Sequence, residues 1–371
     1  MNPINKQQTD RTPSLDGLRA ISIILVLFGH LCGTRGFFTD GKSIAFLGLS
    51  NFGVRVFFVI SGYLITGLLL REMNTTGGIH LLKFYFRRTF RIFPAYYAFL
   101  LFLIFAQPLG FFPLEQGDIL HTLTYTSNYH PMRSWYVGHT WSLSVEEQFY
   151  LLWPATLLLL GRRKGFGAAV IFILLSPLIR WSLFHWFPLM TGIGHQFETI
   201  ADSLATGCAL ACRADWPQWV QQKYDRLLHS KWMILVPFIA LICYAPEHPH
   251  VAYLVGFSIA NIGIAICVDW CIRNPETLIG KILNSAPLVF IGLISYSIYL
   301  WQQLFLNRNS TQSYAAFPFN LVLAAAFALG SYYWIERPSL GLRQRLERRL
   351  FSSAKAEAPS DASPPVLPIR N

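Results

Sequence analysis

The stretch LDGLRAISIILVLFGH, residues 15–30, places an arginine and a histidine in a predominantly apolar run. We expect this run to form the first membrane-spanning helix. Arg19 and His30 are eleven positions apart, so at about 100° per residue they share one helix face, roughly 16 Å apart along the axis. Ionisable groups inside a membrane span are costly and usually functional. The alternative is that Arg19 only anchors the inner helix end and that His30 is an ordinary buried histidine.

The composition of the whole chain supports a membrane protein. Of 371 residues, 53% are hydrophobic and only 13% are charged, and a soluble domain of this composition could not keep its surface hydrated. The net charge of +11 comes from short basic clusters between apolar runs. Such clusters set membrane orientation, so we expect no nucleic-acid partner. The six cysteines lie almost entirely in apolar runs without metal-ligand spacing, so we expect no metal.

The apolar runs predict an all-α polytopic membrane protein with about ten transmembrane helices and both termini on the same side. Placing the N-terminus in the cytoplasm puts 23 of the 30 Lys and Arg residues on the inner side, as the positive-inside rule requires. The polar start and Arg19 predict no cleaved signal peptide. The expected spans are 15–33, 50–70, 92–112, 141–160, 167–187, 196–212, 232–246, 251–272, 285–306 and 314–335.

Three regions follow from this pattern. Residues 1–14 form a cytoplasmic N-terminal segment, residues 15–342 form the membrane domain, and residues 343–371 form a cytoplasmic tail. The tail becomes charged and then rich in Ala, Pro and Ser, which predicts disorder. We expect residues 113–140 to form an outer or partly re-entrant segment, because an eleventh crossing there would move the basic cluster 162–164 to the outer side.

A basic segment and a pair of small residues suggest where an anionic ligand would bind. Arg88 and Arg91 lie at i and i+3 on one helix face, where two guanidinium groups can clamp phosphates. The alternative is a basic stretch resting on anionic lipid headgroups. In the second span, Ser61 and Gly62 would let an extended ligand arm, or simply a neighbouring helix, come close.

Two adjacent carboxylates, Glu146 and Glu147, lie about one turn into the fourth span. They point roughly 100° apart, so one can face a polar cavity while the other pairs with a cation such as Arg180 or Arg55. At their depth in the membrane they could orient the imidazole of His30 and stabilise its protonated form. An apolar environment alone would keep that imidazole neutral and ready to accept a proton.

Taken in chain order, these motifs resemble the acyltransferase-3 family of integral membrane O-acyltransferases. The resemblance covers residues 14–345, and the chain departs from it at Gln302, where many family members carry a histidine. The motifs are Arg19 with His30, Phe58-x-x-Ser61-Gly62, Arg88-x-x-Arg91, Trp141-Ser142-Leu143-x-x-Glu146-Glu147-Gln148-Phe149-Tyr150, Ser295-Tyr296-Ser297-Ile298-Tyr299-Leu300-Trp301 and Glu336-Arg337-Pro338.

The resemblance implies transfer of an acyl group, usually acetyl, from acetyl-coenzyme A (or another acyl-CoA) to a hydroxyl of a cell-surface or lipid-linked carbohydrate. The chain resembles the stand-alone branch, without an SGNH esterase domain, of the bacterial inner membrane. The rival interpretation is a proton-coupled transporter or flippase for a lipid-linked glycan. The oligomeric state stays open.

Within this interpretation each candidate residue receives a role. Arg88 and Arg91, with Arg19, would hold the phosphates of the donor at the cytoplasmic side. The thioester arm would run past Ser61 and Gly62. His30 would act as general base on the acceptor hydroxyl, oriented by Glu146 or Glu147, and a covalent acyl-histidine is the alternative.

Overall fold

The computed structural model describes residues 12–38, 48–187, 192–244 and 251–351. Within these ranges the chain is all-helical and contains no strand, as the apolar runs predicted. The α-helices are α1 (Pro13–Leu31), α3 (Leu49–Thr76), α4 (Leu81–Ala106), α5 (Asp118–Leu123), α6 (Trp135–Gly138), α7 (Thr140–Trp186), α8 (Phe197–Ala211), α9 (Gln218–Leu228), α10 (Val236–Tyr244), α12 (Phe257–Arg273), α13 (Leu278–Leu283), α14 (Ala286–Phe305), α15 (Phe319–Ser331) and α16 (Arg337–Phe351).

Length and hydropathy single out fewer than ten clear membrane-spanning helices among the described residues. In the described residues six helices are long and apolar enough to cross a membrane, or seven if the bent pair Gln218–Leu228 and Lys231–Tyr244 is one span. The predicted spans 141–160 and 167–187 both lie in α7, which breaks at Gly161 (φ 70°, ψ 178°). The predicted span 196–212 contains the 15-residue helix α8, and the predicted span 314–335 contains the 13-residue helix α15 and most of the π-helical turn Tyr332–Glu336 that follows it. Ten crossings are therefore not confirmed.

Helix α8 explains why an apolar run need not be a full span. Every residue from Thr199 to Leu210 is buried, so its apolar sequence serves packing inside the protein. The closest neighbour is α3. A Cβ atom at Gly62 of α3 would collide with the carbonyl oxygen of Leu204, and one at Gly207 of α8 would collide with that of Val59. The two glycines thus let the two backbones touch.

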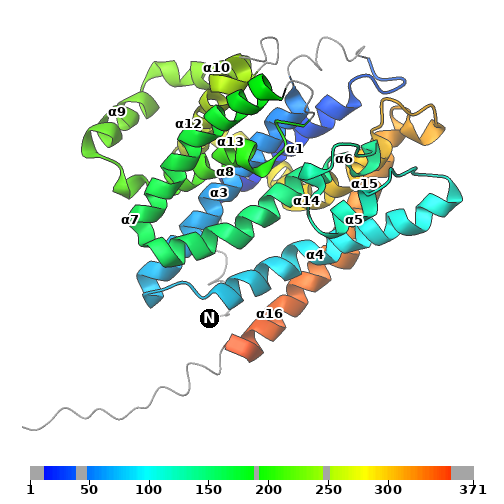
Figure 1. Cartoon of the computed structure of the whole chain (residues 1–371), viewed down its shortest axis with the longest axis horizontal. Coiled ribbons are helices and arrows are strands. Elements are labelled where there is room, and N and C mark those ends of the chain that lie inside the picture. The colour runs from blue at the N-terminus through cyan, green and yellow to red at the C-terminus, as the bar shows by residue number, and fades with distance from the viewer. Residues whose placement is uncertain (1–11, 39–47, 188–191, 245–250, 352–371) are drawn as a thin grey trace, which may run out of the picture.

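Helix α1, which carries Arg19 and His30, packs between α3 and α14. A Cβ atom at Gly292 of α14 would collide with the carbonyl oxygen of Asp16, so α14 also approaches α1 closely. The segment 113–140 contains only short helices, among them α5 and α6, in place of an eleventh long one. It covers one end of the bundle formed by α4, α7 and α14 (Figure 1).

The predicted disordered tail begins as a helix. Helix α16 continues to Phe351, so residues 343–351, which were expected to be disordered, are helical, and residues 352–371 lie outside the described ranges. Figure 1 shows α16 running beside α4. The Glu347 carboxylate binds Arg87 and lies 3.9 Å from Lys83 Nζ, both on α4. These contacts supply the ordering that the local composition does not predict.

Candidate active site

Six of the eight candidate site residues line one narrow cavity of about 100 Å³, here called the charged cavity. It lies where four helices meet, α1, α3, α4 and α7, with α14 closing one wall. Its lining contains three guanidinium groups and two carboxylates, all of which the sequence singled out. They are Arg19, Arg88, Arg91, Glu146 and Glu147, joined by Ser61.

Aromatic and hydroxyl groups hold the charged side chains in place. The Arg88 guanidinium lies over the ring of Tyr150, 4.8 Å from its centroid. The Tyr150 hydroxyl is 2.5 Å from Ser61 Oγ, and the Glu146 carboxylate interacts with both hydroxyls and with the charge of Arg19. Glu147 Oε1 is buried without a hydrogen-bond partner in the described chain. The cavity therefore offers both fixed positive charge and a free acceptor.

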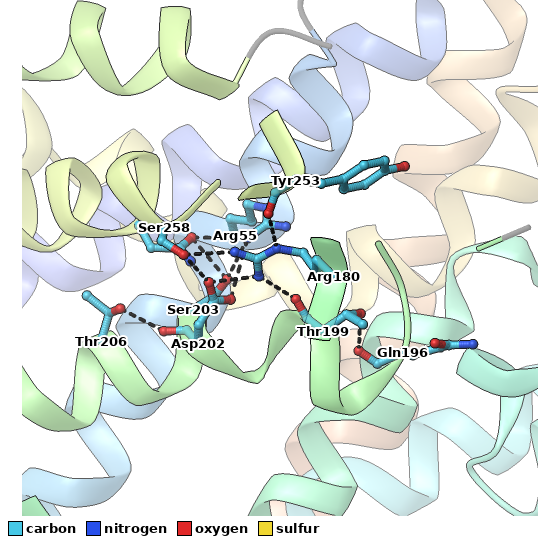
Figure 2. A network of polar contacts seen from close by, with 10 residues as sticks. Arg55, Arg180, Gln196, Thr199, Asp202, Ser203, Thr206, Tyr253 and Ser258 are labelled. Atoms are coloured by element: carbon cyan, nitrogen blue, oxygen red, sulfur yellow. Dashed lines mark hydrogen bonds and ion pairs between the residues drawn. The ribbon is translucent and has the colours of Figure 1, made fainter. Parts of the chain in front are cut away.

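The expected pairing of these carboxylates with Arg180 or Arg55 is wrong. Figure 2 shows both arginines directed at Asp202 of α8. Arg180 Nη1 donates to Asp202 Oδ2 at 2.9 Å, and Ser258 Oγ donates to the same oxygen at 2.8 Å. Asp202 is fully buried and is the carboxylate partner of both arginines, whereas the cations that interact with Glu146 are Arg19 and Arg88.

Gly62 does not line the charged cavity. Its place against the Leu204 carbonyl makes it a helix-packing residue, which is the alternative that the sequence left open.

His30 lies in a second cavity of about 480 Å³, here called the polar cavity. Its Nδ1 is 2.9 Å from Oε1 of Gln302 on α14, and its ring meets Trp135 edge to face. In the described residues neither Glu146 nor Glu147 hydrogen-bonds to His30. The expected carboxylate partner is thus replaced by an amide, because the close packing of α14 on α1 brings Gln302 within hydrogen-bond distance of the ring.

The two cavities share a wall. Val54 and Tyr299 line both of them. The Tyr299 hydroxyl donates to the His139 carbonyl at 3.1 Å and lies 2.6 Å from Ser142 Oγ. A ligand arm in the charged cavity and a second ligand in the polar cavity would therefore lie on the two sides of this wall.

His139 is a site residue that the sequence analysis missed. Its Nε2 is 3.0 Å from the Leu300 carbonyl oxygen, so that nitrogen carries the proton. Its Nδ1 is buried without a partner in the described chain, and the residue lines the polar cavity. A lone pair is therefore available. The one signal in the sequence was its place two residues before the Trp141-Ser142-Leu143 motif.

Gln302 is the other missed residue, and the sequence did carry a signal for it. It occupies the position where the chain departs from the family pattern. The structure places its amide on His30, so the departure falls on a residue in contact with the candidate base.

The comparisons with known proteins agree with this geometry. A family model described as "Acyltransferase domain" matches residues 12–336. O-acetyltransferase OatA of Staphylococcus aureus (strain NCTC 8325 / PS 47) is 29% identical over 364 residues, which cover 88% of this chain and 57% of that protein. Putative O-acetyltransferase SACOL0978 of S. aureus (strain COL) is 31% identical with the same coverage.

The chain thus spans little more than half the length of these curated relatives. No solved structure matches it. The family match and the apolar helices together indicate an integral membrane protein. With the family model covering nearly the whole helical part, the chain belongs to the acyltransferase-3 family.

Proposed function

We propose that the protein is a membrane O-acetyltransferase that moves the acetyl group of acetyl-coenzyme A to a hydroxyl of a cell-surface or lipid-linked carbohydrate. The observation that carries the proposal is the pair of cavities that meet at Val54 and Tyr299. One offers an anion clamp and the other offers imidazole lone pairs. We further propose a bacterial inner membrane with both chain termini in the cytoplasm, which places the arginines on the donor side.

The charged cavity is assigned to the donor. Arg88 and Arg91 would hold the phosphates of coenzyme A, with Arg19 deeper on α1. Glu146 interacts with Arg19 and Arg88, so its role is to orient the guanidinium groups. The thin arm of the donor would then span roughly the 16 Å from Arg19 toward His30.

His30 is assigned as the general base. With Nδ1–H donating to Gln302 Oε1, its Nε2 keeps a lone pair. The acceptor hydroxyl gives its proton to Nε2 while its oxygen forms a bond to the thioester carbonyl carbon. The carbon–sulfur bond breaks, and the imidazolium returns the proton to the leaving thiolate. Proton transfer of this kind contributes about 10²–10⁴-fold to a rate.

The alternative function, a proton-coupled transporter or flippase, explains fewer features of the two cavities. A proton-coupled transporter needs the histidines but gives no reason for three arginines around a cavity beside them. Both relatives carry O-acetyltransferase in their names, which favours group transfer.

The decisive experiment is transfer of label from radioactive acetyl-coenzyme A into membrane glycan by the purified protein in proteoliposomes. We expect His30→Ala to lower transfer about 10²-fold or more. His229→Ala is the matched control, since His229 is exposed at the end of α9. Transfer that survives His30→Ala but is lost in His139→Gln would move the base to His139. No label from acetyl- or succinyl-coenzyme A would refute the transferase.

A further inference from the structure

The polar cavity has an excess of positive charge that the proposed chemistry does not use. Two arginines line it, Arg133 and Arg308, together with three histidines. No Asp or Glu is among the described residues that line it. A cavity lined by one sign of charge concentrates ligands of the opposite sign.

Arg308 has the clearest unused binding capacity. It follows α14, where its Nη2 donates to the Gly29 carbonyl at 2.8 Å and its guanidinium lies 5.8 Å from the Trp135 ring centroid. Its Nε is buried and has no hydrogen-bond partner within the described chain. A buried guanidinium N–H without an acceptor is costly, and an anionic oxygen in the cavity would satisfy it.

Arg133 also lines the cavity and is held by a different set of contacts. Its Nη1 donates to the carbonyl oxygens of Ser127 and His130, and its Nη2 donates to Nδ1 of His195 at 3.1 Å. Asp118 lies behind it, outside the lining, and offsets part of its charge. Burial, and then the nearby Arg133, lower the pKa of His195 to about 3. His195 is therefore neutral, and its Nε2–H is a donor.

The remaining walls suit a sugar ring. Trp135 and Trp141 present apolar ring surfaces, and Gln303 and Asn309 present amides. A few polar groups among aromatic walls are typical of sites for small organic ligands.

We propose that the polar cavity is the acceptor site and that it selects a carbohydrate carrying an anionic group, bound by Arg308, with Arg133 adding positive charge to the cavity. The anion is the carboxylate of an acidic sugar or the phosphate of a glycan linkage, because both present oxygens that a guanidinium group binds. This inference rests on the proposed function for its biological meaning. The binding itself can be measured without any acyl donor.

The test compares three probes on purified protein in detergent by calorimetry: cellobiouronic acid, its carboxyl-reduced form cellobiose, and glucose 1-phosphate. We expect at least one charged probe to bind about ten-fold or more tightly than cellobiose, as a charge-assisted hydrogen bond predicts. The stronger of the two charged probes identifies carboxylate or phosphate as the preferred group.

Three variants make the test specific. Arg308→Gln should abolish the difference in affinity between the charged probes and cellobiose. Arg308→Lys should retain part of that difference. Arg35→Gln is the control, since Arg35 is exposed nearby and donates to the Thr311 carbonyl outside the cavity. Equal binding of all probes, no binding of the charged ones, or an unchanged difference in Arg308→Gln would overturn the proposal. Failure of acetyl transfer with intact selective binding would overturn only the proposed function.

Discussion

At the scale of single residues, the state of His30 depends on one neighbour. The Gln302 amide oxygen accepts from Nδ1 at 2.9 Å, which fixes the tautomer that leaves Nε2 free. Glutamine brings no charge to this role, unlike the aspartate that orients histidine in a catalytic triad. In the proposed mechanism the imidazolium of His30 would be stabilised here by a hydrogen bond and not by a carboxylate, so the geometry of this single contact matters more.

Replacing Gln302 tests this dependence. Gln302→Leu keeps the approximate volume but removes the acceptor, so we expect kcat for acetyl transfer to fall about ten- to a hundred-fold, the equivalent of about 1–3 kcal/mol for a lost buried hydrogen bond. KM for acetyl-coenzyme A should hardly change. Gln312→Leu, at an exposed position in the segment that follows α14, is the control. Equal kcat in both variants would show that Gln302 does not position His30.

At the scale of elements, small residues decide how closely the helices approach. Gly62 and Gly207 lie where the backbones of α3 and α8 touch. The approach keeps Ser61, the neighbour of Gly62, in the wall of the charged cavity. Without hydrophobic driving force between helices in lipid, such close packing supplies much of the association energy.

Gly62→Ala should therefore destabilise the fold. The added Cβ would overlap the Leu204 carbonyl, a backbone atom that cannot rotate away, and overpacking of this kind costs about 1–3 kcal/mol. Gly67→Ala on the same helix has open space around the new Cβ and should be neutral or slightly stabilising, as helix propensity predicts. The apparent melting temperature in detergent measures both. A similar loss in the two variants would contradict the packing argument.

At the scale of the whole molecule, one carboxylate joins four helices. Asp202 of α8 binds Arg55 of α3, Arg180 of α7 and Ser258 of α12, as Figure 2 shows. Both arginine side chains are essentially inaccessible to solvent. Two buried cations sharing one anion make the arrangement intolerant of losing that anion.

Asp202→Asn should therefore lower the yield of folded protein sharply. Removing the charge leaves Arg55 and Arg180 buried without a carboxylate, which costs about 3–5 kcal/mol. Asp215→Asn breaks the ion pair with Arg162, whose side chain is 36% exposed, and should cost at most about 1 kcal/mol. Size-exclusion profiles and thermal unfolding of the two variants check this. Comparable stability of both would show that the Asp202 contacts are dispensable.

The amino-acid sequence by itself determined the helical class, the membrane character and most of the charged lining of the charged cavity. Long apolar runs and ionisable residues within them carry this information locally. For that reason the sequence alone identified six residues that line one cavity in the structure. They are Arg19, Ser61, Arg88, Arg91, Glu146 and Glu147.

Only the tertiary structure decided the partners of these residues. Which carboxylate pairs with which cation depends on helix packing, so Asp202 binds the arginines that were expected to pair with one of the two glutamates, and Gln302 takes the place of a carboxylate beside His30. The number of spans also depends on packing. The apolar sequence of a helix such as α8 is the same whether lipid or protein surrounds it, and only the packing of its neighbours shows that it is buried inside the protein.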